Sequence, residues 1–175
     1  DGWQPVGTNE RAPFTATFDG NGHVIRNLYI NPLGYNDYYI GLFGYVSGEF
    51  VELRNLILSG PSMSIKGAWS VGALAGHAGK GVQIQKIFST GRVSGDSAVG
   101  GIVGSLDTGS LSQSFTSGTV SGYEGIGGLI GYALNSTLHD NITATYVSGT
   151  QYVGKIIGFS SDMTTSTTYG ATDIT

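Results

Sequence analysis

The chain has no cysteine, few charged residues and no long apolar run. Without cysteine there is neither a disulfide framework nor a thiolate metal site, and the redox compartment stays open. Charged residues make up 11% of the 175 positions, against roughly 25% in an average globular protein. With only 8 Lys and Arg and a net charge of −4, we expect neither nucleic acid nor anionic lipid as a partner.

Leader and membrane signals are also missing from the sequence. No segment approaches the ~20 apolar residues of a spanning helix, so we expect no membrane insertion by this segment. The opening "DGWQPVGTNE" has neither the basic start nor the apolar stretch of a signal peptide. We therefore expect a piece of a longer chain whose 175 residues form one domain.

What the sequence does contain is a glycine-rich repeat. "VGGIVG" (99–104) returns as "IGGLIG" (126–131) and "VGKIIG" (153–158), and it occurs earlier as "VGALAG" (71–76). The last glycines of these units, Gly76, Gly104, Gly131 and Gly158, recur at an almost constant spacing. Ile84, Leu111 and Leu138 follow the same spacing. Two independent landmarks therefore share one period.

Within one period the apolar residues come in short runs, and none shows the spacing of an amphipathic helix. Residues 99–125 predict three short strands, near "VGGIVGSL", "SLSQSF" and "TSGTVSG". Such strands bury their apolar side only when successive turns stack in parallel. We predict an all-β fold, a parallel β-helix or β-solenoid of about five to six coils with a period of about 27–28 residues.

The period also predicts a division of the single domain 1–175. Residues 1–44 are expected to form an atypical N-terminal coil or cap, and residues 45–158 the regular coils. Residues 159–175 are expected to form a polar last coil, truncated from a longer chain and frayed or covered.

Stacking predicts columns of inward side chains. They are Ile102, Leu129 and Ile156, then Phe88, Phe115 and Ile142, and finally Val93, Val120, Val147 and Ile174. Strict alternation along a strand would turn either Leu129 or the adjacent Ile130 outward.

The glycines resemble a phosphate-binding loop only superficially. "GIGGLIG" (125–131) has Ile130 where the third glycine of a dinucleotide fingerprint belongs. Glycine instead suits corners that need a positive φ or that lack room for a side chain. We expect no nucleotide and no other cofactor.

Several segments carry a family resemblance: "WQPVG" (3–7), "FTATFDGNGHVIRNLYI" (14–30), "YIGLFGYV" (39–46) and the later glycine units. Together they resemble the GLUG-motif repeat regions of large exported bacterial proteins. These include adhesins, filamentous haemagglutinin-like exoproteins and non-catalytic regions of surface peptidases. The resemblance implies a β-solenoid stalk or binding module and supplies no catalytic residues. Lys155 and "GALAG" (72–76) depart from the pattern, which predicts differently built corners there.

Metal-binding and catalytic sites are not favoured. Asp19 and Asn21 in "FDGNGH" are more typical of a turn than of a calcium loop, because no further carboxylate follows at a suitable distance. His23, His77 and His139 belong to different columns, so no shared metal site is expected. Acidic residues of neighbouring coils do not align as the acid and base of a polysaccharide-cleaving enzyme would. We therefore predict that the chain is not an enzyme.

Aromatic residues are the candidate ligand-binding residues. Tyr35, Tyr38 and Tyr39 lie in the loop "NPLGYNDYYIG" (31–41), and Trp69, Tyr123 and Tyr152 lie in corners of three coils. Exposed rings suit stacking on sugars or protein partners. The alternative is that they cover the end of the solenoid and its corner backbone.

Two functions are consistent with these features. The first is a non-catalytic structural and binding module of a bacterial surface or secreted adhesin. It would act as a stalk and contact neighbouring domains of the same chain and a host-surface or matrix protein or glycan. The second is a carbohydrate-binding or substrate-presenting region of a large exported enzyme, such as a surface peptidase or a polysaccharide-degrading enzyme. Both predict an extracellular or cell-surface location.

Overall fold

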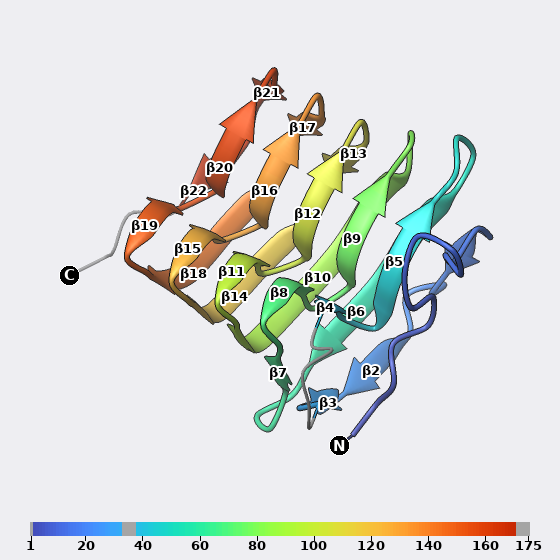
Figure 1. The fold of residues 1–175 in the computed structure, drawn as a ribbon, viewed down its shortest axis with the longest axis horizontal. Helices are drawn as coiled ribbons and strands as arrows, with labels where there is room; N and C mark the ends of the chain where they lie inside the picture. The colour runs from blue at the N-terminus through green and yellow to red at the C-terminus, as the bar shows by residue number, and fades with distance from the viewer. Residues whose placement is uncertain (1, 33–37, 171–175) are drawn as a thin grey trace.

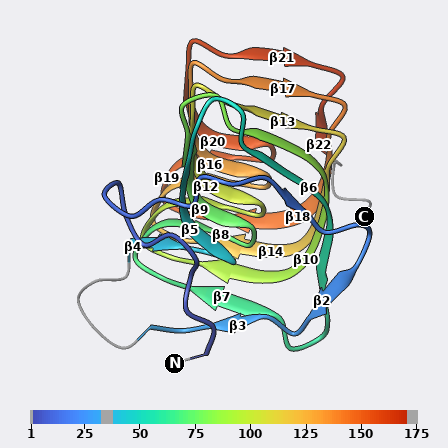
Figure 2. The same ribbon diagram turned by 90° about the vertical axis from the view of Figure 1, so that its right-hand side faces the viewer.

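The computed structural model describes residues 2–32 and 38–170, and within these ranges every regular element is a β-strand. The strands stack into a β-solenoid of about five turns, as the repeat predicts. Figure 1 shows the coils side by side in chain order, and Figure 2 shows successive coils lying over one another.

A regular coil has four strands. The clearest example is β11 (Ser97–Gly100), β12 (Val103–Asp107), β13 (Ser110–Ser112) and β14 (Phe115–Ser121). The next two coils are β15 (Glu124–Gly127), β16 (Ile130–Leu134), β17 (Thr137–His139) and β18 (Ile142–Ser148), then β19 (Gln151–Gly154), β20 (Ile157–Ser161), β21 (Thr164–Ser166) and β22 (Tyr169–Gly170).

Earlier coils have the same plan with different strand lengths. The first described strands are β1 (Phe18–Asp19), β2 (Val24–Arg26) and β3 (Tyr29–Ile30). They precede β4 (Tyr38–Ile40), β5 (Phe43–Ser47), β6 (Glu52–Ser59) and β7 (Ser64–Lys66). The following coil contains β8 (Trp69–Gly72), β9 (Ala75–Gly79) and β10 (Gln83–Ser94), a strand long enough to pair with both β13 and β14.

Three parallel sheets hold the coils together. Two have five strands each, in the orders β19-β15-β11-β8-β4 and β20-β16-β12-β9-β5, and a third has 12 strands. The register confirms the predicted pairing of Ile84 with Leu111 and of Leu111 with Leu138. The first coils are longer than the regular ones, as the pairing of Ile25 with Leu58 shows. The segment "IRNLYI" (25–30) resembles "LRNLIL" (53–58) in sequence, but the register places Ile25 beside Leu58 and not beside Leu53.

The prediction of three strands per coil was wrong because "VGGIVGSL" is two strands, β11 and β12, separated by a bend. A Cβ atom on Gly100 would lie 2.1 Å from the carbonyl oxygen of Val103, so the chain folds back too tightly for a side chain. Hydrogen bonds from the amides of Ile102 and Val103 to the carbonyl oxygen of Leu129 continue the stacking through the bend.

This bend explains why both residues of an adjacent apolar pair are buried. Leu129 and Ile130 are each fully buried, although strict alternation would turn one outward. Leu129 lies at the corner between β15 and β16, where the chain changes direction, so the alternation of a straight strand does not apply. The column of Ile102, Leu129 and Ile156 is inward as predicted, with Ile156 partly buried.

The predicted inward column of Phe88, Phe115 and Ile142 has the correct register but faces outward. The side chains of Phe88 and Ile142 are 39% and 49% exposed. Alternation is the reason: Val120 is buried, and Phe115 lies an odd number of positions before it on the same strand, so it points to the opposite face. Val93 and Val120 are inward, as predicted.

The third predicted column, which begins with Val93 and Val120, continues with Val147 and Ile174. Val147 packs against the core while partly buried. Ile174 lies outside the described residues.

The interior becomes more polar toward the C-terminal coils. Along the inward column that begins at Leu58, the next residues are Ser89, Thr116 and Thr143. The Thr116 hydroxyl donates to the carbonyl oxygen of Gly128 at 2.9 Å and lies 2.9 Å from the Thr143 hydroxyl. Buried hydroxyls are thus satisfied by one another and by corner carbonyls.

Asn141, at the corner between β17 and β18, is fully buried. Its Oδ1 accepts from the amide of Ser114 at 3.0 Å, and its Nδ2 donates to the carbonyl oxygen of Leu111 at 2.9 Å. One side chain therefore holds both sides of the corner between β13 and β14 in the preceding coil.

The N-terminal segment lies along the outer edge of β5. Val6 and Phe14 form parallel bridges with Phe43 and Val46, and the indole of Trp3 donates to the carbonyl oxygen of Leu42 at 2.9 Å. In the last coil, residues 164–166 of β21 are exposed. The three-part division of the domain stays a prediction. Among the described residues there is no helix long and apolar enough to cross a membrane.

Candidate ligand-binding groove

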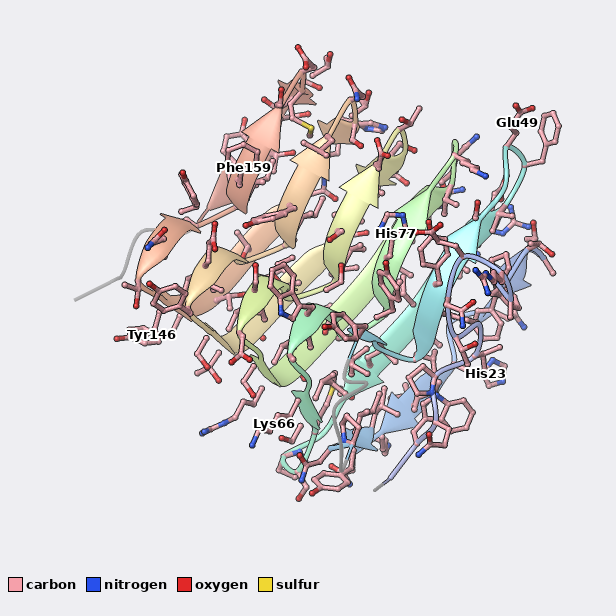
Figure 3. The ribbon with its side chains drawn as sticks, viewed as in Figure 1. His23, Glu49, Lys66, His77, Tyr146 and Phe159 are labelled. Carbon is pink, nitrogen blue, oxygen red and sulfur yellow. The ribbon has the colours of Figure 1, made fainter. Side chains whose placement is uncertain are left out.

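One wall of the candidate site is formed by the residue that follows the last glycine of each repeat. Tyr45, His77, Ser105, Tyr132 and Phe159 occupy equivalent positions on β5, β9, β12, β16 and β20. Figure 3 shows His77 and Phe159 toward opposite ends of this sheet. Because parallel strands are in register, a single position of the repeat becomes a continuous row along the solenoid.

The second wall comes from the sheet that contains β4, β8, β11, β15 and β19. In each strand the second residue has a positive φ; these residues are Tyr39, Ser70, Ala98, Gly125 and Tyr152. This left-handed residue interrupts the alternation of side chains between the two faces of the strand. The residue that follows it, Val71 in β8 and Val99 in β11, is fully buried. Non-glycine residues adopt this conformation at a cost of roughly 1 kcal/mol or more, so its recurrence shows that the stacking imposes it.

The two walls touch through their backbones. A Cβ atom on Gly104 would lie 2.4 Å from the backbone carbon of Ser70, and Gly131 stands in the same relation to Ala98. Neither glycine has a positive φ. Glycine is needed here because two strands approach closely and leave no room for a side chain. Lack of room was one of the two reasons for glycine predicted from the sequence.

Between the walls lies an open groove of about 370 Å³. Its middle is formed by the small residues Ser70, Ala98 and Ser105. Larger side chains line the two ends of the groove. Those toward the N-terminal coils are Tyr38, Tyr39, Trp69 and His77, and those toward the C-terminal coils are Tyr132 and Leu134. The size is within the range of small-molecule sites, roughly 300–1,000 Å³.

The N-terminal end of the groove is a packed group of three rings. The ring of His77 stacks on Tyr45 with centroids 4.4 Å apart, and Tyr39 meets Tyr45 edge to face at 5.0 Å. Toward the C-terminal end, Phe159 contacts Tyr132 at 5.5 Å and Tyr152 at 5.3 Å. The rings therefore hold one another in place before any ligand arrives.

Hydroxyl groups line the middle of the groove and its edge. The hydroxyls of Ser70 and Ser105 are hydrogen-bonded to each other across the two walls. Burial raises the pKa of the Tyr132 phenol, and the carboxylate of Glu124 raises it further. Ser97 Oγ is buried and forms no hydrogen bond with the described residues.

Burial also lowers the pKa of His77, while the negative charges of Asp107 and Glu10 partly oppose this effect. A neutral imidazole is thus favoured, with one donor and one acceptor nitrogen. Ser105 and Asp107 line the same groove. Among the described residues, however, the hydroxyl of Ser105 bonds to Ser70 and not to His77. The arrangement offers hydrogen bonds and ring faces to a ligand.

The aromatic residues predicted from the sequence to bind a ligand do not all line the groove. Tyr38, Tyr39 and Trp69 line the groove, and Tyr152 packs on Phe159 near its C-terminal end. The three corner aromatics do not share one column: Trp69 is in register with Ser97 and Glu124, so Tyr123 and Tyr152 lie one position to either side of that register.

Tyr123 is exposed outside the described lining of the groove, and its hydroxyl accepts a hydrogen bond from Gln151 at 3.2 Å. Tyr35 lies outside the described residues.

Sequence reasoning missed Tyr45, Tyr132 and Phe159 as part of an aromatic row. The signal was present, because each directly follows the last glycine of a repeat unit. What could not be read from spacing was that this row faces the Tyr39 row across a groove.

The other candidate sites have structural roles. The Asp19 carboxylate accepts from the amide of Asn21 at 2.8 Å and from the Asn55 side chain at 2.9 Å, as in a turn. These hydrogen bonds, that of Asn55 first, and the nearby Arg54 lower the pKa of Asp19. Within the described ranges no three His, Cys, Asp or Glu side chains are grouped as metal ligands.

Comparison with known proteins gives one similarity to report. The chain is 33% identical over 111 residues to a halomucin of Haloquadratum walsbyi, which covers 63% of this chain and 1% of the halomucin. This chain thus spans a very small part of that protein's length. No protein-family model matches the chain, and no solved structure matches it. The resemblance to GLUG-motif repeats stays a prediction.

Proposed function

We propose that this chain is a non-catalytic β-solenoid segment of a large cell-surface or secreted protein. The stacked coils would act as a spacer, and the groove would contact a ligand. The observation that carries the proposal is the groove itself. One wall is the partly buried row of His77, Ser105 and Tyr132, and the half-exposed rings of Tyr38 and Trp69 line the other side along the stacked coils.

The similarity to halomucin supports the setting rather than the ligand. The halomucin is far longer than this chain, and its name places it with mucin-like surface proteins. A repeat segment of such a protein separates other parts from the cell, since each coil contacts only its neighbours and the stack extends in one direction. In its most specific form the proposal is a stalk of a bacterial adhesin built from GLUG-like repeats.

Surface exposure is tested by labelling intact cells of the source organism with antibodies raised against the 175-residue chain. We expect labelling without permeabilisation, and loss of that signal after brief treatment of whole cells with protease. Labelling that requires permeabilisation would refute the surface location.

A second candidate is a substrate-presenting region of a large exported enzyme. It is favoured by one observation, which is that His77, Ser105 and Asp107 line the same groove as the exposed rings. The complete gene of the parent protein separates the two functions. Further repeats on either side of this segment would support the stalk, and a catalytic domain beside it would establish the second candidate.

A further inference from the structure

The groove places half-exposed aromatic rings beside groups that form hydrogen bonds. Trp69 and Tyr38 are neighbours in register on β8 and β4, and both side chains are about half exposed. Exposed rings at successive coils are platforms for the apolar C–H faces of sugar rings. Adjacent coils are about 4.8 Å apart, which is close to the length of one monosaccharide in an extended chain.

Polar groups suited to sugar hydroxyls lie beside these platforms. The carboxylate of Asp107 can accept hydrogen bonds, and the partly exposed hydroxyl of Ser105, which is bonded to that of the buried Ser70, lies at the middle of the groove. The neutral imidazole of His77 adds one donor and one acceptor. A few polar groups placed within an aromatic lining are typical of sites that orient a small polar ligand.

The charge of the groove selects among glycans. Of the described residues that line it, Asp107 is the one with a full charge, and neither Lys nor Arg is among them. The chain as a whole carries a net charge of −4. Uronic acids, sialic acids and sulfated sugars would meet repulsion here, so an uncharged glycan is favoured.

A peptide ligand fits the groove less well. Extended peptides bind by adding a strand to an open sheet edge. In this groove, β8 and β11 are each paired on both sides, and so are β9 and β12. Their backbone groups are therefore already used, and recognition must rely on side chains.

A second hollow shares two lining residues with the groove, which favours a chain over a single sugar as the ligand. A cavity of about 140 Å³ shares Tyr38 and Tyr39 with the groove and is lined further by Trp3, Pro5 and Ile30. The ring of Trp3 is thus available in this second hollow.

We propose that this groove binds an uncharged oligosaccharide or polysaccharide chain, with sugar rings stacked on Trp69 and Tyr38 and sugar hydroxyls bonded to Asp107. This inference rests on the proposed function of the groove as a ligand contact. It adds the class of ligand and the residues that recognise it.

The test is affinity electrophoresis of the whole chain in native gels that contain a β-glucan, a mannan, a galactan or a xylan, with polygalacturonate as the acidic control. We expect retardation by at least one neutral polymer and none by polygalacturonate. If none of the four neutral polymers retards the chain, or if polygalacturonate does so equally, the proposal is wrong.

A matched pair of tyrosine variants locates the binding. Tyr38 and Tyr123 are 51% and 53% exposed, but only Tyr38 lines the groove. We expect Tyr38→Ala and Trp69→Ala to weaken binding roughly tenfold or more, as loss of a central aromatic contact does. Tyr123→Ala should bind as the unmodified chain does, and equal losses in Tyr38→Ala and Tyr123→Ala would refute the location.

Two further measurements guard against misfolding and against the wrong class of ligand. Far-UV circular dichroism and melting should be unchanged in Tyr38→Ala.

Trp3→Phe leaves Trp69 as the single tryptophan, and the emission of Trp69 should shift when the polymer that retards the chain is added. An unchanged emission, or a shift with poly-L-proline and with none of the sugars, would contradict stacking of sugar on Trp69. These outcomes are independent of cell labelling, so failure of glycan binding leaves the surface location to be judged separately.

Discussion

Replacement of Leu129 by alanine tests the stacked interior directly. The side chain is fully buried between Ile102 of the preceding coil and Ile156 of the following coil. Its amide donates to the carbonyl oxygen of Ile156 at 2.9 Å, and its carbonyl oxygen accepts from the amide of Ile102 at 2.9 Å. These hydrogen bonds hold the coil spacing, so neighbouring coils cannot close over the space that the substitution leaves.

The expected magnitude follows from that rigidity. Leucine-to-alanine substitutions in cores cost about 2–5 kcal/mol, and the cost rises with the cavity that remains. Because the backbone on both sides of Leu129 is held by ladders, we expect the upper half of this range, about 3–5 kcal/mol. Leu129→Asp would also bury an unpaired carboxylate, and with total stabilities of roughly 5–15 kcal/mol it should unfold the C-terminal coils.

Ile142→Ala is the matched control. Ile142 is on a later strand of the same coil, and its side chain is 49% exposed. We expect a loss of about 1 kcal/mol or less, since little apolar surface leaves the core. This comparison also tests the finding that the column of Phe88, Phe115 and Ile142 faces outward.

The assay is urea unfolding followed by far-UV circular dichroism, together with amide hydrogen exchange. Solenoids need not unfold in one step, and both tryptophans, Trp3 and Trp69, belong to the N-terminal part of the chain. Tryptophan fluorescence should therefore report a later transition than circular dichroism in Leu129→Ala. Equal costs for Leu129→Ala and Ile142→Ala would refute the assignment of the two faces.

Three other predictions concern the core, the groove and the last coil. Thr116→Val removes the hydroxyl that is hydrogen-bonded to the carbonyl oxygen of Gly128 and to the hydroxyl of Thr143. We expect the free energy of unfolding in urea to fall by about 1–3 kcal/mol. An unchanged free energy would contradict the buried hydroxyl cluster. His77 has a folded pKa below its ordinary value of 6.5, so its contribution to stability is complete above that pH and is lost as the pH falls through the folded pKa. Melting of His77→Phe should accordingly fall less between neutral and acidic pH than melting of the unmodified chain, and parallel curves would contradict this. Amide exchange should be faster in residues 160–170 than in 111–116, because the former pair on one side only among the described strands; equal, strong protection in a monomer would show a finished cap.

The fold class and most of the register could be predicted from the repeat in the sequence. The period is a property of the chain alone, and a repeat too short to bury its own apolar face must stack on its neighbours. The predicted pairs Ile84 with Leu111 and Val93 with Val120 followed directly, and the structure confirms them. The absence of helical spacing was equally local evidence, since it depends only on which residues lie three or four positions apart.

Which face of a sheet each row of side chains occupies, and which rows lie next to one another, depends on the packing of the coils in three dimensions. Phe88 and Leu129 belong to equally apolar rows, yet one row is outward and the other lies at a corner where alternation is interrupted. Spacing along one chain cannot show a fold-back such as that at Gly100, because its tightness depends on atoms of Val103 and of the next coil. The groove has the same origin: Trp69 and His77 are visible in the sequence, but they line one cavity only because two sheets touch at glycines that have no room for a side chain.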